Sequence, residues 1–302
     1  MSEREAASHL PVLVDEVAFL LRPRGGGWVV DGTVGMGGHA ERILETTGED
    51  VRLLGIDADA EAIARAARRL ARFGARVSLA RGSFRDLGAH AEAAGVGEAR
   101  AILLDLGLSS YQLDESGRGF SFLREEPLDM RFDATRGHTA AELLAGAPEP
   151  ELARLLRDYG DEPHARRIAR RLVERRRRAP IRTTGDLVDA VKAAVPRAAW
   201  PRRTHVATRT FQALRMAVNA EPEALEAALP AAAGLLAPGG RLGVIAFHSG
   251  EDRIVKRAFR ALLAAGFVQL DPAPLGPGRA EVAGNPRARS AKLRVLERAE
   301  AA

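Results

Sequence analysis

The first third of the chain alternates short apolar runs with amphipathic segments. Helical periodicity marks residues 12–21, 38–47 and 61–74, where apolar side chains recur one turn apart. The runs between them have the length of buried strands: GWVVDGT (27–33), VRLLGIDAD (51–59), RVSLARGSF (76–84) and ARAILLDLGLSS (99–110). Strands that alternate with helices predict an α/β fold with a doubly wound, Rossmann-like parallel sheet.

This alternation stops after Asp133. Helical patterns then follow one another without a strand between them, and the arginine-rich segment 165–178 keeps a single apolar stripe. Strand patterns return at RLGVIAFHS (241–249) and SAKLRVLER (290–298). We therefore predict a discontinuous sheet domain made of residues 1–133 and 219–302, with an all-helical domain inserted at residues 134–218.

A glycine-rich turn, DGTVGMGGHA, follows the first predicted strand. Gly35, Gly37 and Ala40 match the G-x-G-x-x-G/A pattern that seats a pyrophosphate at the start of a helix. Asp31 precedes these glycines, where its charge repels a phosphate but attracts an ammonium or a sulfonium. Asp57, 20 residues after Gly37, is placed to accept hydrogen bonds from ribose hydroxyls. The turn alone leaves both ligand types open.

Three features favour S-adenosylmethionine over a nicotinamide dinucleotide. The first is Asp31, which has no counterpart in the dinucleotide pattern. The second is LAPGGRLGVIAF, because a Pro-Gly-Gly turn before a late strand is common in methyltransferases of this fold. The third is DLGLSS, which begins at Asp105 and places polar groups at the carboxyl end of the fourth strand, where open α/β sheets bind ligands.

Composition excludes several classes of protein. The 302 residues include no cysteine, and the seven histidines show no H-x-x-x-H pairing, so we expect no metal site. The apolar segment LPVLVDEVAFLLRP is interrupted by Asp15 and Glu16 and is shorter than the roughly 20 residues that cross a bilayer. We expect no membrane association and a cytoplasmic protein.

Positive charge is concentrated in two stretches, although the net charge is only +5. RRIARRLVERRRR (166–178) and NPRARSAKLR (285–294) offer cations to a polyanion such as RNA. The alternative is that these arginines only lie on solvent-exposed helix faces and bind no ligand.

Together these motifs resemble one family over nearly the whole chain: the bacterial methyltransferases that modify N(4) of a cytosine in 16S ribosomal RNA, also called the MraW or ribosomal RNA small subunit methyltransferase H family. Gly250, where the family usually has leucine, and Pro222 depart from its pattern. The matching blocks are HLPVLVDEV, DGTVGMGGHA, GIDADAEAI, LLDLGLSSYQLDESGRGFSF, PLDMRFD, RIARRLVERR, TRTFQALRMAVNAE, FHSGEDRIVK and NPRARSAKLR.

This resemblance implies S-adenosylmethionine as the cofactor and assigns residues to it. Asp57 would hold the ribose, Phe84 would pack on the adenine, and Asp105 and Gln112 would complete the pocket. The methionine and sulfonium side would be lined by Gly37, Gly38 and His39, with Asp31 and Gly35 as further candidates. Structural alternatives are a core aromatic for Phe84, a polar helix start for His39 and an exposed loop side chain for Gln112.

The acceptor amine of cytosine is a poor nucleophile, so alignment is the main catalytic task. Asp105 is the candidate catalytic residue, as an acceptor for the amine hydrogens. Because Leu108 stands where many amino methyltransferases have a stacking aromatic, Tyr111 or Phe120 would stack on the flipped base. Candidate contacts to 16S ribosomal RNA in the small subunit are Ser109, Ser110, Tyr111, Arg118, Phe120, Arg131, His248, Arg170, Arg171, Arg287 and Arg289.

Other interpretations stay open at this point. Ser249 and Asp252 have the spacing of a helix capping box, and the loop with Arg118, Phe120 and Arg131 would also suit a folded lid. The sequence has no Tyr-x-x-x-Lys pair for proton transfer, which argues against a nicotinamide-dependent oxidoreductase. A noncatalytic RNA-binding assembly factor would not need three strand-end acids. The sequence is compatible with either free RNA or the assembled small subunit as the substrate, and with a homodimer.

Overall fold

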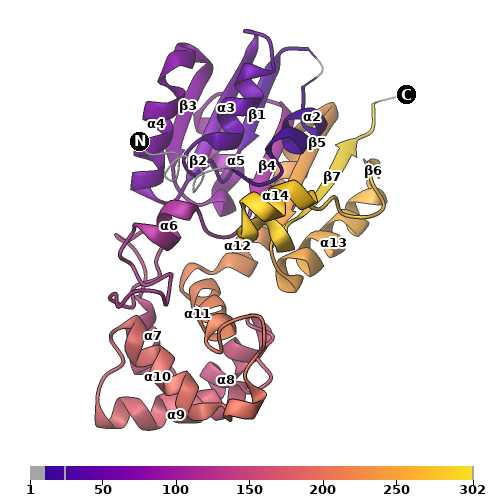
Figure 1. Cartoon of the computed structure of the whole chain (residues 1–302). Helices are drawn as coiled ribbons and strands as arrows, with labels where there is room; N and C mark the ends of the chain where they lie inside the picture. The colour runs from indigo at the N-terminus through magenta and orange to yellow at the C-terminus, as the bar shows by residue number, and fades with distance from the viewer. Residues whose placement is uncertain (1–10, 24, 301–302) are drawn as a thin grey trace. The chain divides into compact units, whose positions relative to one another are not determined.

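The computed structural model describes residues 11–23 and 25–300, so Leu10, the first residue of the apolar amino-terminal segment, lies outside it. The chain forms two compact units (Figure 1). Unit 1 joins the residues up to Ser109 to those from Pro222 onwards, and unit 2 is Ser110–Glu221.

Unit 1 is built on a seven-stranded sheet in the order β3-β2-β1-β4-β5-β7-β6 (Figure 1). Strands β1 to β5 are parallel, which confirms the doubly wound sheet. Strand β7 runs antiparallel to β5 and β6, and the short β6 has no counterpart in our predictions. The strands are β1 (Gly27–Asp31), β2 (Val51–Asp57), β3 (Val77–Arg81), β4 (Ala99–Asp105), β5 (Leu236–Ala246), β6 (Phe267–Gln269) and β7 (Lys292–Arg298).

Both faces of this sheet are buried, because neighbouring apolar residues of each central strand point to opposite sides. Val29 and Leu53 belong to one apolar cluster, whereas Val30 and Leu54 belong to the other. The helices of unit 1 are α2 (Val14–Leu20), α3 (Gly38–Glu45), α4 (Ala60–Leu70), α5 (Leu87–Ala93), α12 (Glu221–Leu235), α13 (Ser249–Leu263) and α14 (Arg279–Gly284). Continuous apolar strands are therefore covered on two sides, as in other parallel sheets.

The Pro-Gly-Gly turn lies inside β5 rather than before it. This strand begins at Leu236, five residues earlier than the sequence pattern predicts, and its register against β4 shifts between Ala99 and Ala101. Gly239 adopts φ 70°, a left-handed conformation that favours glycine. The turn thus acts as an irregularity within the strand.

Unit 2 is helical, and it begins at Ser110 rather than at the predicted residue 134. The segment 110–133 joins it because its backbone is hydrogen bonded to the helical part: Leu128 N donates to Arg182 O at 2.9 Å, and Thr184 N donates to Glu126 O at 3.0 Å. Asn219 Oδ1 also accepts a hydrogen bond from Phe132 N at 2.7 Å. The helices are α6 (Ser110–Asp114), α7 (Ala140–Gly146), α8 (Glu149–Asp158), α9 (Ala165–Arg178), α10 (Thr184–Ala194) and α11 (Thr208–Asn219).

Candidate cofactor site and acceptor residues

Three carboxylates end three neighbouring strands of unit 1. Asp31, Asp57 and Asp105 are the last residues of β1, β2 and β4, and these strands are parallel and adjacent. Their negative charges act on one another, since Asp57 raises the pKa of Asp31 after the larger effect of its burial. The structure thus brings the three predicted acids to one edge of the sheet.

The glycine turn is tied to this edge by two backbone hydrogen bonds. Gly35 N donates to Asp57 Oδ2 at 2.9 Å, and Thr33 N donates to Asp31 Oδ1 at 3.1 Å. Gly35 and Gly37 have φ of 51° and 82°, and a Cβ added at Gly37 would lie 3.3 Å from the side chain of Leu70. Glycine is required here both by backbone conformation and by the close approach of α4.

Asp31 is 1% exposed. Burial is the main cause that raises its pKa to about 7, and the hydrogen bond from Thr33 opposes this shift. A buried carboxyl without a cationic partner retains its proton to higher pH. A cation bound beside Asp31 would favour the ionised form, so this position suits an ammonium or a sulfonium.

His39, in the first turn of α3, is 6% exposed and holds the amino-terminal segment in place. Its Nε2 lies 2.8 Å from the carbonyl oxygen of Val12, and this oxygen can only accept, so Nε2 carries the ring proton. Burial lowers the pKa of His39 to about 4, although the bond to Val12 opposes the shift. The neutral ring therefore presents an unprotonated Nδ1, 3.6 Å from Asp105 Oδ2.

Asp105 has one carboxyl oxygen to offer. Its backbone N donates to Thr33 Oγ1 at 2.6 Å, but its Oδ1 atom is buried and has no hydrogen-bond partner among the residues that the structure describes. Burial, followed by the charges of Asp31 and Glu251, raises the pKa of Asp105 well above its usual range. An orphaned buried acceptor is costly, and a bound ligand would satisfy it.

His248 caps α13, so our prediction that Ser249 caps this helix was wrong. The Nδ1 atom of His248 accepts from Gly250 N at 3.2 Å and from Glu251 N at 3.3 Å. Its Nε2 lies 3.0 Å from Glu251 Oε1, and this buried nitrogen has no hydrogen-bond partner among the described residues. Asp252 accepts from Arg294 Nε at 2.8 Å and from Lys292 Nζ at 3.3 Å. His248 thus has a structural task at the start of α13.

The remaining cofactor candidates lie in different units. Phe84 of unit 1 is half-buried, in a short 3-10 turn that Ser83 caps, and it packs against the apolar cluster of Val30. Gln112 of unit 2 lies on α6 and is buried, which excludes the alternative of an exposed loop side chain. Ser109 is the last residue of the first segment of unit 1, and unit 2 begins with Ser110 and the half-buried Tyr111.

The loop side chains that we predicted as RNA contacts hold unit 2 together. Arg118 Nη1 donates to the carbonyl oxygens of Arg131 and Phe132, at 3.0 and 2.9 Å, and its guanidinium lies over the ring of Phe120. That ring is buried and stacks on Phe132. Arg131 forms a two-point ion pair with Asp129. These contacts agree with the folded-loop interpretation and leave Tyr111 as the more accessible aromatic.

The arginines of α9 are not equivalent. Arg170 and Arg171 lie 3.8 and 3.6 Å from the carboxylates of Glu149 and Glu174. Arg176 donates to the carbonyl oxygen of Ala147 at 2.7 Å. In the other basic stretch, Arg287 and Arg289 are exposed on the turn Pro286–Ser290.

Residues 11–23 and 25–300 contain no group of three side chains placed to bind a metal ion. Within the same ranges, no helix has the length and hydrophobicity needed to cross a membrane.

The fold and this sheet edge define a Rossmann-like methyltransferase. The strand order departs from the dinucleotide-binding order 3-2-1-4-5-6 because the antiparallel β7 lies between β5 and β6, and an acid precedes the glycines of the first turn. The family model described as "MraW methylase family" matches residues 6–299. The chain belongs to the MraW methylase family, and it is an S-adenosylmethionine-dependent methyltransferase.

Individual relatives agree with this assignment. A protein of Heliobacterium modesticaldum named ribosomal RNA small subunit methyltransferase H is 49% identical, over 96% of this chain and 98% of its own. The protein of the same name from Geotalea uraniireducens is 48% identical over the same shares. A solved rRNA methylase from Streptococcus thermophilus aligns with 95% of this chain and 94% of its own at 12% identity and a TM-score of 0.44, and the family assignment rests on the sequence matches.

Proposed function

We propose that this enzyme transfers a methyl group from S-adenosylmethionine to the exocyclic N(4) amine of a cytosine in 16S ribosomal RNA. The observation that carries the proposal is the match over nearly the full chain to relatives named ribosomal RNA small subunit methyltransferase H. The acid-lined edge of unit 1 supports it, because Asp31 and Asp57 can serve the cofactor while Asp105 Oδ1 has no partner among the described residues and can serve the acceptor amine.

The residues of unit 1 fit S-adenosylmethionine, whose sulfonium supplies an electrophilic methyl group. Asp57, already oriented by Gly35 N, would accept the ribose hydroxyls. Asp31 faces the same edge with a raised pKa and would be ionised by the cationic methionine portion. Phe84 would pack on the adenine. The backbone of Gly37 and Gly38 would line the methionine side, next to His39.

The protein's task in the transfer is to align the amine. A new bond forms between N(4) and the methyl carbon while the bond between that carbon and sulfur breaks, and the resulting ammonium releases a proton to solvent. Asp105 Oδ1, once ionised, would accept a hydrogen of the amine and hold its lone pair toward the methyl group. A strong general base is not needed, because the methylated ammonium is acidic.

We further propose that unit 2 supplies contacts to RNA and that the substrate is RNA within the small ribosomal subunit. This substrate places the enzyme in the cytoplasm. Residues of a single copy of the chain provide all the groups assigned above, whether or not two copies associate.

The test is direct identification of the product. Purified enzyme is incubated with methyl-labelled S-adenosylmethionine and small subunits from cells that lack this methylase, and the RNA is digested to nucleosides. We expect label in N(4)-methylcytidine from 16S RNA alone. Label in another nucleoside, or no transfer by folded enzyme that binds S-adenosylmethionine, would contradict the proposal. An oxidoreductase would instead bind NAD.

A further inference from the structure

One stretch of unit 2 contains cations but no acid. Between Asp189 and Glu221 the sequence has no aspartate or glutamate, yet it contains Lys192, Arg197, Arg202, Arg203, Arg209 and Arg215. By contrast, acids flank the arginines of α9 or pair with them, as Asp186 does with Arg175 at 3.0 Å. The positive charge of the acid-free stretch is therefore not compensated along the chain.

The centre of this stretch is the loop 196–205, which connects α10 to α11. Arg197, Arg202 and Arg203 are exposed there. No ion pair joins these three arginines to an acid in the described part of the chain. Arg197 lies over the ring of Trp200, 5.7 Å from its centroid, which leaves the edge of the guanidinium available. Exposed guanidinium groups without carboxylate partners can bind phosphate without first breaking an ion pair.

The loop is held by specific contacts on both sides of these arginines. Trp200 Nε1 donates to the carbonyl oxygen of Val195 at 3.0 Å, which fixes the first half. In the second half, His205 stacks on Phe122 at 4.6 Å between ring centroids, and its Nδ1 accepts from Ala207 N at 3.2 Å. The arginine side chains thus extend from a backbone of defined shape, which lowers the entropy lost on binding.

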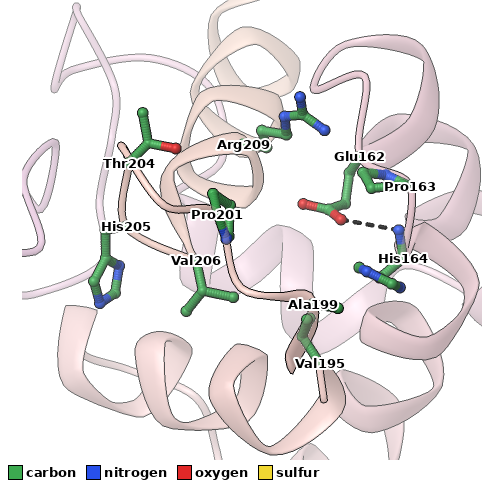
Figure 2. A pocket seen from close by; sticks show the side chains of 10 residues that line it. All are labelled: Glu162, Pro163, His164, Val195, Ala199, Pro201, Thr204, His205, Val206 and Arg209. Carbon is green, nitrogen blue, oxygen red and sulfur yellow. Dashed lines mark hydrogen bonds between the residues drawn. The ribbon is translucent and has the colours of Figure 1, made fainter. Parts of the chain in front are cut away.

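A small hollow adjoins this loop, and Arg197, Arg202 and Arg203 are not among the residues that line it. Figure 2 shows Pro201, Thr204 and His205 along one wall and Glu162 on another. Glu162 is buried, and its carboxylate accepts from His164 N at 2.9 Å. Arg209 also lines the hollow, but the buried carboxylate of Glu162 disfavours a phosphate there, so an anion would meet the exposed arginines outside the hollow.

We propose that the loop 196–205 is a binding surface for the phosphate backbone of RNA, with Arg197, Arg202 and Arg203 as its cations. This inference rests on the proposed function, because it takes ribosomal RNA as the ligand. The surface contributes affinity and orientation without sequence discrimination, since guanidinium–phosphate contacts do not distinguish bases. This surface is distinct from helix α9, whose arginines are the RNA-binding candidates that the sequence pattern favours.

Two triple variants with the same change of charge test this surface. R197Q/R202Q/R203Q alters the loop, and R68Q/R257Q/R260Q alters three exposed arginines of α4 and α13 in unit 1, outside both basic stretches, as a matched control. Affinity for unmethylated small subunits is measured at several salt concentrations. Each lost phosphate contact should reduce the slope of log affinity against log salt by about 0.7 to 0.9, so the loop variant should lose about 2 to 3 in slope. The control variant should keep the parent slope, and both variants should keep the parent affinity for S-adenosylmethionine.

Each outcome decides the question. A parent slope in the loop variant, or an equal loss in both variants, overturns the inference. A loop variant that binds more weakly with an unchanged slope also overturns it, since that pattern indicates contact with a ribosomal protein. The proposed function fails separately, when the parent enzyme itself neither binds nor methylates the subunits.

Discussion

At the scale of single residues, the site combines acids that destabilise one another when no ligand is bound. Asp31 and Asp105 are held at one sheet edge, and burial raises the pKa of each. Such an arrangement costs folding free energy in the free enzyme and is relieved by a cation. Stability and cofactor affinity are therefore coupled through the same carboxyl groups.

Asp31→Asn should stabilise the free enzyme in a pH-dependent manner. The pKa of Asp31 is raised to about 7 in the folded state, from 3.8, so its contribution favours folding below pH 3.8 and is lost as the pH rises through 7. At 1.36 kcal/mol per pKa unit, the variant should gain up to about 4 kcal/mol over the parent at pH 8, and much less at pH 5. Urea unfolding at both pH values measures the difference. An advantage of equal size at both would show that Asp31 is not a buried, protonated acid.

Asp105→Ala should lower the rate of methyl transfer by about 100-fold, the usual scale for losing one oriented hydrogen-bond partner in a transition state. Affinity for the ribosomal subunit should stay at the parent value, because no RNA phosphate contact is removed. Single-turnover assays and filter binding separate the two quantities. Weaker subunit binding with a normal single-turnover rate would refute the role of Asp105 as an acceptor for the amine.

At the scale of elements, sequence patterns predicted the parallel strands and most helices, but not the direction of β7 or the residue that caps α13. Strand-end acids were predictable because parallel strands present their carboxyl ends at one edge. The antiparallel direction of β7 was not, since an apolar run has the same composition in either direction. Our prediction placed the cap of α13 at Ser249 instead of His248, because imidazole is a less common helix cap than serine.

His248→Ala should destabilise the enzyme by about 1 kcal/mol, the usual cost of removing a helix cap. His248→Asn should restore most of this loss, because its side-chain oxygen can accept from the same backbone N–H groups. Thermal and urea unfolding of both variants provide the measurement. If asparagine restores stability but not methyl transfer, His248 also acts on the substrate; if it restores neither, the cap is not what His248 contributes.

At the scale of the whole molecule, the sequence predicted an α/β unit and a helical unit but placed their boundary too late. The segment 110–133 has no helical periodicity, and its membership in unit 2 depends on long-range hydrogen bonds such as those of Asn219 to Met130 and Phe132. Local patterns cannot reveal contacts between residues so distant in sequence. The roles of the two units, cofactor binding and RNA binding, remain predictions.

The most direct test of the central claim, that the acid edge of unit 1 binds S-adenosylmethionine, is calorimetric titration of Asp57→Ala. Loss of its charge-assisted hydrogen bonds to the ribose should cost about 1.5 to 3 kcal/mol, an increase of roughly 10- to 150-fold in Kd. Asp59→Ala is the matched control, because Asp59 caps α4 by accepting from Glu61 N at 3.1 Å and is not assigned to the ribose, and it should keep the parent Kd. Parent enzyme should not bind NAD. An unchanged Kd in folded Asp57→Ala, or an equal loss in Asp59→Ala, would contradict the account.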